Sequence, residues 1–177
     1  MDASSRIVFG YHGTTPEFSE RLIRGEVVPA DWKPSTNVFD WLGAGIYFWE
    51  FAPERARTWA KKGGVVGAII NLGRCLDLSE IQSTELLADA FGPFAREQAR
   101  QKQPLPRNKG KRRELDCAVI DFAAKQIRKK TGQAVQTVRG AFLEGGPIFP
   151  GSSLLKETHI QIAVRDISCI IGLFRPT

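Results

Sequence analysis

The hydrophobic positions of this chain fall into short runs separated by glycine, proline and polar residues. Apolar runs and strict apolar-polar alternation predict strands, whereas apolar residues that recur every three or four positions predict helices. On these criteria the predicted strands are residues 7–11, 43–50, 65–72, 135–142, 158–165 and 169–174. The run VVGAIINL at 65–72 is almost entirely apolar, which predicts a strand at the centre of a sheet.

Caps and breakers give the predicted helix boundaries in the first third of the chain. Thr15 followed by Pro16 is a favourable helix start, and Gly25 is a suitable end. A second helix is predicted to begin at Pro53 and to end near Gly63. Residues 29–37 are predicted to form a loop.

Further helices are predicted between residues 79 and 131. Ser79 with Gln82 three residues later fits a capping box, and Gly92-Pro93 is predicted to break the helix that follows into two pieces. Residues 114–131 form the longest predicted helix, and the basic residues of its last turn suit the negative end of its dipole.

The order of these elements predicts an α+β fold. Helices and strands are mixed without a regular strand-helix-strand rhythm, and several strands alternate, so mainly antiparallel sheets are favoured over a doubly wound parallel sheet. The 177 residues suffice for one hydrophobic core. A single domain over residues 1–177 is therefore expected.

Composition narrows the class of protein. A hydrophobic content of 42% with 25% charged residues is ordinary for a globular protein. No apolar run approaches the length of a bilayer, and the N-terminus lacks a basic region followed by an apolar core, so a cytoplasmic protein without membrane contact is expected. Cys75, Cys117 and Cys169 lack metal-ligand spacing, so we expect reduced thiols and no metal site.

The formal net charge of +6 bears on partners. A basic surface attracts polyanions such as RNA or DNA, although many soluble proteins are mildly basic. Residues 101–113, QKQPLPRNKGKRR, combine two prolines and a dense basic run with no apolar periodicity, which predicts a mobile exposed loop. This loop is either a polyanion contact or a solubilising segment.

Candidate chemistry is concentrated in segments far apart in the sequence. The first strand ends in Tyr11, His12, Gly13 and Thr14, and residues 43–50 read GAGIYFWE. The late strand THIQIAVR alternates strictly and sends its one central polar side chain to the polar face.

Tyr-His-Gly-Thr, then G-x-G-I-Y-F, then a late alternating strand with Gln161 at its middle resembles the ADP-ribosyltransferases of the diphtheria-toxin and poly(ADP-ribose) polymerase type, whose signature is His, Tyr and Glu. The resemblance extends from Tyr11 to about Phe174 and implies two small, mainly antiparallel sheets that form a cleft for NAD, flanked by helices. Gln161 stands where the family has glutamate.

The resemblance also implies roles for individual residues. His12 would bind the adenosine ribose, and the backbone of Gly13, with Thr14 beside it, would hold the nicotinamide amide. Tyr47 would stack on the nicotinamide ring. Trp59 would form another wall of the cleft, although core packing explains it equally well.

Gln161 determines the expected activity. Glutamine can hydrogen-bond a ribose hydroxyl but has no charge, which could cost on the order of 3 kcal/mol of transition-state stabilisation. Glu157 or Glu144 would then be the candidate acid, unless both are surface carboxylates. At about 13 Å along an extended strand, Glu157 and Gln161 would not reach one hydroxyl without a bulge.

These observations leave three functional hypotheses. The first is a toxin-like mono-ADP-ribosyltransferase that transfers ADP-ribose from NAD to a macromolecule, RNA or DNA being slightly favoured over protein. Such a toxin would also need a neutralising protein partner. The second is a pseudoenzyme that binds NAD or ADP-ribose without turnover, and the third is a basic nucleic-acid-binding protein.

Overall fold

The computed structural model describes residues 4–27 and 31–177, and there it shows the mixture of helices and strands expected of an α+β protein. The predicted loop at 29–37 is irregular over its described residues, and residues 29 and 30 lie outside the described part. In chain order the elements are β1 (Ser4–Thr14), α1 (Pro16–Ile23), β2 (Ile46–Glu50), α2 (Pro53–Ala60), β3 (Gly64–Gly73), β4 (Cys75–Asp77), α3 (Ile81–Arg100), β5 (Asn108–Lys109), β6 (Arg112–Arg113), α4 (Glu114–Thr131), β7 (Thr137–Phe142), β8 (His159–Val164), a 3-10 helix (Ile167–Cys169) and β9 (Ile170–Phe174).

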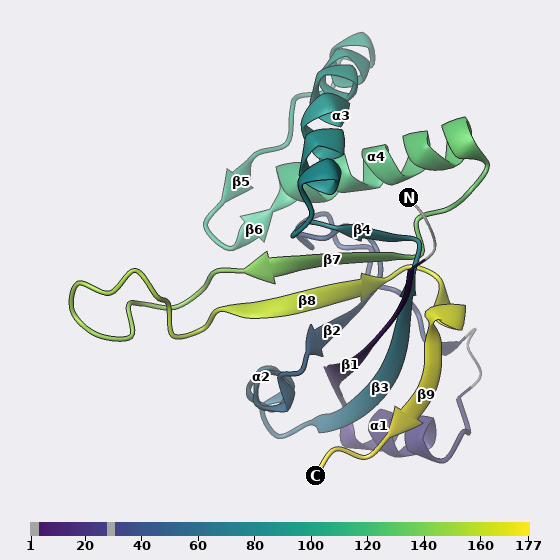
Figure 1. Ribbon diagram of the computed structural model, residues 1–177, viewed down its shortest axis with the longest axis vertical. Coiled ribbons are helices and arrows are strands. Elements are labelled where there is room, and N and C mark those ends of the chain that lie inside the picture. The colour runs from purple at the N-terminus through teal and green to yellow at the C-terminus, as the bar shows by residue number, and fades with distance from the viewer. Residues whose placement is uncertain (1–3, 28–30) are drawn as a thin grey trace.

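Within the described residues, seven strands form one sheet in the order β4-β7-β8-β2-β1-β3-β9, and β5 and β6 form a separate hairpin (Figure 1). Neighbouring strands are antiparallel except β4 and β7, which are parallel. The expectation of two small sheets is therefore wrong, because β2 pairs with β8 on one edge and with β1 on the other. The apolar strand β3 is interior, but β2 is the central strand.

The junction between β1 and β2 is short. Gly10 lies opposite Glu50 and Tyr11 opposite Trp49, whereas β1 stays in register with β3 as far as Thr14. The far end of β1 therefore follows β3 and parts from β2. This opening in the sheet lies beside the predicted Tyr-His-Gly-Thr motif.

Each face of the sheet has its own hydrophobic core. On one face, side chains of β2, β3 and β8 pack with Leu22 of α1 and with Trp32. On the opposite face, Leu42, Leu76 and Ala163 pack with Ile120 of α4. In Figure 1, α3 and α4 lie at the β4–β7 edge, and α1 lies near β3 and β9. We call these the α1 face and the α4 face.

Some predicted helix boundaries are confirmed. Thr15 is the N-cap of α1, where its hydroxyl accepts a hydrogen bond from the Phe18 backbone N–H at 3.2 Å. The helix predicted at 114–131 is observed as Glu114–Thr131, and Gly132 ends it in a left-handed conformation with φ of 72°. It is shorter than α3, whose 20 residues exceed its 18.

Two helix predictions are wrong. The N-cap of α3 is Glu80, because the Ser79 hydroxyl donates instead to the Asp77 carboxylate at 2.6 Å. Pro93 lies inside the unbroken α3. Phe94 next to it is buried against Phe122 of α4, with ring centroids 5.6 Å apart. This tertiary packing offsets the hydrogen bond that a proline removes from the helix.

A buried ionic cluster ties the centre of the sheet to its edge. Arg139 of β7 makes a two-pronged hydrogen bond to Glu50, at 2.6 and 2.8 Å, and also donates to Asp77 of β4. Asp77 is fully buried and further accepts from Arg6 at 3.0 Å. Burial alone would raise the pKa of Asp77, but its bonds from Ser79 and Arg139 hold that pKa below its usual value.

The basic segment 101–113, predicted as a loop, contains a short hairpin. Residues 108–113 form the β5–β6 hairpin, and the side-chain oxygen of Asn108 accepts from the backbone N–H groups of Leu115 and Asp116 at 3.1 and 3.3 Å. The hairpin is thus attached to the first turn of α4, whose free N–H groups need such an acceptor. In the described part of the chain, no helix is long and apolar enough to cross a bilayer.

Candidate functional site

The fold brings the three predicted catalytic residues onto neighbouring strands. His12 is on β1, Tyr47 on β2 and Gln161 on β8, and β2 lies between the other two strands. Tyr47 pairs with Ala163, and Trp49 with Gln161. Opposed residues of an antiparallel pair share a face. Tyr47 and Gln161 therefore both point to the α4 face.

His12 points to the other face. Its ring lies 5.6 Å from that of Phe48 and 5.3 Å from that of Trp32, between centroids, so it belongs to the α1 face. Its Nδ1 bonds the carbonyl of Tyr47 at 2.8 Å. A carbonyl only accepts, so Nδ1 carries the hydrogen and Nε2 has the free lone pair. Burial lowers the pKa of His12, and the neutral ring is favoured.

Gly13 lies at the opening between β1 and β2. The Phe9 carbonyl accepts from the Phe51 backbone N–H, so strand alternation directs the backbone groups of Tyr11 and Gly13 toward β2 as well. The pairing of β1 with β2 ends at Tyr11. The Tyr47 carbonyl, which would otherwise face Gly13, accepts a hydrogen bond from Nδ1 of His12. The N–H and C=O of Gly13 are therefore directed into the opening.

Helix α2 packs against Gly13 at one side of this opening. A Cβ built on Gly13 would lie 2.8 Å from the Ala56 carbonyl oxygen and 3.0 Å from a ring carbon of Trp59. Trp59 is not a core residue, since 63% of it is exposed. The core explanation for Trp59 is thus wrong, and its indole lies beside the Gly13 backbone. Thr14, the last residue of β1, is half-buried opposite Gly64.

The Tyr47 hydroxyl is committed to the turn before β2. It donates to the Gly43 carbonyl at 2.7 Å and accepts from the Leu42 backbone N–H at 3.0 Å. Burial raises the pKa of Tyr47, so the phenol stays protonated. Asp121 of α4 secures the same turn, because it accepts from Ala44 N–H at 3.1 Å. The G-x-G segment is therefore a turn held by side chains.

Hydrogen bonds fix the orientation of the Gln161 amide. Its Oε1 accepts from the indole N–H of Trp41 at 2.8 Å, and its Nε2 lies 3.1 Å from Nε2 of His159. Nδ1 of His159 bonds the Glu157 carbonyl at 2.7 Å, so it carries the hydrogen and Nε2 accepts from the amide. One amide N–H and one oxygen lone pair remain to bind a ligand.

A row of aromatic rings crosses the α4 face around Gln161. Centroid distances between successive rings are 5.8 Å from Trp59 to Trp49, 6.5 Å to His159, 5.4 Å to Phe142 and 4.7 Å to Trp41. We call these residues the aromatic row. The rings are tilted and pack against one another, and Trp49 and His159 among them are buried.

The two candidate carboxylates are bound elsewhere. Glu157 precedes β8 and lies 3.7 Å from Arg55, and Glu144 lies 3.5 Å from Lys111. Both ion pairs are at the edge of the site, and Gln161 itself is bonded to Trp41 and His159. The structure thus places both acids beside basic groups, as the surface explanation expects.

The sequence analysis missed three residues that form the site. Trp41 and His159 orient the Gln161 amide. Arg55 precedes Trp59 by one helical turn on α2, and its Nη2 is buried without a hydrogen-bond partner in the described structure. The four-residue spacing of Arg55 and Trp59 was the available signal. No sequence signal pointed to Trp41, in the turn before β2, or to His159, at the start of β8.

The described residues contain no cluster of three or more His, Cys, Asp or Glu that could hold a metal ion. Comparison of the chain with family models, curated proteins and solved structures gave no match. The function is therefore inferred from the site itself.

Proposed function

We propose that this protein is an NAD-dependent mono-ADP-ribosyltransferase. The main support is the opening between β1 and β2, where the Gly13 backbone meets the exposed indole of Trp59 on the face that also holds Tyr47 and Gln161. Backbone N–H and C=O groups match a carboxamide, and an indole plane matches an aromatic base. Nicotinamide contains both a carboxamide and an aromatic ring.

The remaining parts of NAD also find partners in this arrangement. Arg55 has a buried N–H without a partner and lies on the same side of α2 as Trp59, which suits the pyrophosphate. His12 holds the Tyr47 carbonyl and so keeps the opening free for a ligand. In this proposal His12 and Tyr47 support the site through the backbone and the turn, while Gly13, Trp59 and Gln161 touch NAD.

The chemistry is displacement at the ribose carbon bonded to nicotinamide. The bond to the nicotinamide nitrogen breaks and its electron pair leaves with the base, while positive charge develops on the sugar as in glycoside hydrolysis. A nucleophile of the acceptor forms the new bond and loses its proton to water. Gln161 positions a ribose hydroxyl with its free amide N–H or lone pair but adds no charge. Transfer of a single ADP-ribose to a strongly nucleophilic acceptor is therefore favoured over elongation of an ADP-ribose chain.

The acceptor is a macromolecule, and the net charge of +6 favours nucleic acid over protein. The test is to incubate the protein and a cell lysate with NAD labelled in the adenylate. Label in a nuclease-sensitive polymer is expected, and it should be lost with Gln161→Ala and Trp59→Ala. Label that resists nucleases but not proteases would make the acceptor a protein. If the wild-type protein neither labels a polymer nor releases nicotinamide, the proposed transferase activity is contradicted.

A second candidate is a pseudoenzyme that binds NAD or ADP-ribose without turnover. It is favoured by the two fixed hydrogen bonds of the Gln161 amide and by the absence of a carboxylate there. It predicts saturable NAD binding, measured by calorimetry, without nicotinamide release. Gln161→Glu would then start hydrolysis, whereas an enzyme that uses glutamine already releases nicotinamide before the change.

A further inference from the structure

The β5–β6 hairpin borders the aromatic row. The guanidinium of Arg113 lies over the Phe142 ring, 6.0 Å from its centroid, and Phe142 contacts both His159 and Trp41. Lys111 on the same hairpin pairs with Glu144, which follows β7. A ligand bound to the hairpin would therefore lie next to the site around Gln161.

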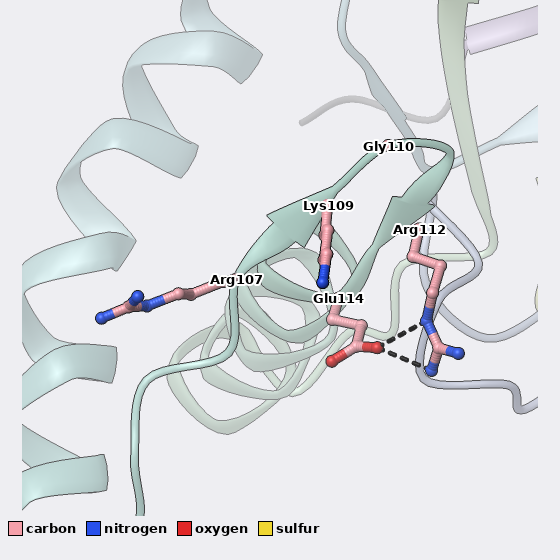
Figure 2. A pocket seen from close by; sticks show the side chains of 5 residues that line it. All are labelled: Arg107, Lys109, Gly110, Arg112 and Glu114. Atoms are coloured by element: carbon pink, nitrogen blue, oxygen red, sulfur yellow. Dashed lines mark hydrogen bonds and ion pairs between the residues drawn. The ribbon is translucent and has the colours of Figure 1, made fainter.

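The hairpin surrounds an open depression lined by basic groups. Arg107, Lys109 and Arg112 line it; in Figure 2 Lys109 points toward Glu114, which is bonded to Arg112, and Arg107 extends outward on the side opposite Arg112. That bond involves Nε and Nη2 of Arg112, at 2.8 and 2.7 Å from one carboxylate oxygen. No ion pair is recorded for Arg107 or Lys109 within residues 4–27 and 31–177, and both are exposed. The depression therefore has a net positive charge available to an anion.

An aromatic ring lies at the border of this depression. Arg112 lies over one face of Phe39, 5.2 Å from its centroid, while 42% of Phe39 remains exposed. The backbone N–H of Arg113 donates to the Phe39 carbonyl at 3.3 Å, which joins this loop to the hairpin. Positive groups beside an exposed ring suit a single-stranded nucleic acid, because phosphates bind the cations and a base stacks on the ring.

We propose that the β5–β6 hairpin and Phe39 form the docking surface for a single-stranded nucleic acid, with phosphates on Arg107 and Lys109 and a base on Phe39. Asn108 fixes the hairpin to α4, so the surface is preformed and little ordering is required on binding. That the docked strand is also the acceptor rests on the proposed function. RNA and DNA share the phosphate and base chemistry used here.

The test is anisotropy of labelled single strands of about 12 nucleotides, RNA and DNA in parallel, without NAD. In single strands each phosphate contact contributes about 0.7 to the salt slope, or roughly fivefold in affinity at about 0.1 M salt. Arg107→Gln with Lys109→Gln should therefore weaken binding about 25-fold and reduce the slope by about 1.4. Phe39→Ala should weaken binding by about fivefold or more with an unchanged slope.

Lys129→Gln with Lys130→Gln is the matched control, because it removes the same charge from the far end of α4. It should change affinity less than twofold, roughly, since a screened distant charge contributes little. Equal loss in both double variants would overturn the proposal, as would equal affinity for an acidic polypeptide. Tighter binding of RNA than DNA would assign a 2′-hydroxyl contact within the proposed surface.

The two proposals fail separately. The hairpin variant should keep acceptor-independent release of nicotinamide from NAD, because its substituted residues lie outside the NAD site. Strand binding without any nicotinamide release would refute the transferase and leave the docking surface intact. Strand binding that does not change with the hairpin substitutions would refute the docking surface and leave the transferase intact.

Discussion

The side-chain amide of Gln161 donates to Nε2 of His159 at 3.1 Å, and this bond fixes which end of the amide faces the ligand. Trp41 holds the other end, because its indole N–H requires the oxygen. His159 in turn is held by the Glu157 carbonyl. Gln161 is thus a member of a hydrogen-bonded chain that runs from Trp41 to the Glu157 carbonyl.

Under the proposed function, replacing His159 by phenylalanine should lower nicotinamide release about tenfold, because the ring stays in the aromatic row but the acceptor for the Gln161 amide is lost. The pH profile separates positioning from structure. Burial lowers the pKa of His159, with Arg55, Glu157 and Glu144 as the charged groups around it. Wild-type activity should fall below that pKa as Nε2 gains a proton, whereas His159→Phe should lose this step. An unchanged profile would contradict the positioning role.

Gln161→Glu should raise the pKa of His159. A carboxylate at 161 would keep the Trp41 bond and favour a proton on His159 Nε2, since an opposite charge stabilises the imidazolium. NMR titration of the ring measures this directly, and Gln161→Met is the uncharged control. If the enzyme needs charge at this position, turnover should also rise, by on the order of a hundredfold. A His159 pKa that stays as low as in the parent would contradict the observed geometry.

Gly13→Ala should destabilise the fold by about 1–3 kcal/mol, because the added methyl group meets the Ala56 backbone carbonyl and α2 must move. Urea unfolding followed by circular dichroism measures the loss. Gly146→Ala is the matched control, since a Cβ there has nothing within 4 Å. The proposed function adds that Gly13→Ala loses NAD binding while Gly146→Ala does not. Equal stability of the two variants would show that α2 does not close over Gly13.

Asp77→Ala should cost about 3–5 kcal/mol, because it leaves Arg139 partly unpaired in a buried cluster. Glu80→Ala is the control, since Glu80 is an exposed partner of Arg6 and its removal should cost less than about 1 kcal/mol. Denaturant midpoints with unchanged slopes are the measurement. A loss for Asp77→Ala no larger than for Glu80→Ala would contradict a buried cluster that ties β4 to β2.

Stability should fall as the pH decreases from about 7 to about 5. Burial lowers the pKa of both His12 and His159, so the unfolded chain takes up protons first once the pH drops below about 6.5. Each histidine contributes at most about 1.4 kcal/mol per pH unit. The chain has 2 histidines, so the double variant His12→Asn with His159→Asn should make stability nearly independent of pH in this range. The carboxylates of lowered pKa, Asp77, Asp166 and the partly exposed Glu20, act mainly below about pH 5. A slope that persists in the double variant would refute the histidine origin.

The sequence by itself determined most of the local structure. The Thr15 cap and the Gly132 stop depend on neighbours in the chain, and both were observed as predicted. The apolar-polar alternation also placed Tyr47 and Gln161 on strands and put Gln161 on the face opposite Ile162, because it permits one register. The prediction that this face is polar is wrong, since His159 and Ala163 on the same face are buried.

Only the tertiary structure decided how those strands meet. The joining of β1 and β8 through β2, the opening at Gly13 and the placement of His12 on the opposite face depend on contacts between segments far apart in sequence. The same holds for Pro93, where packing against α4 outweighs a local breaker. Local sequence patterns depend only on nearby residues and therefore do not predict contacts between distant segments. For that reason the roles of Trp41 and His159 beside Gln161 were found only in the folded structure.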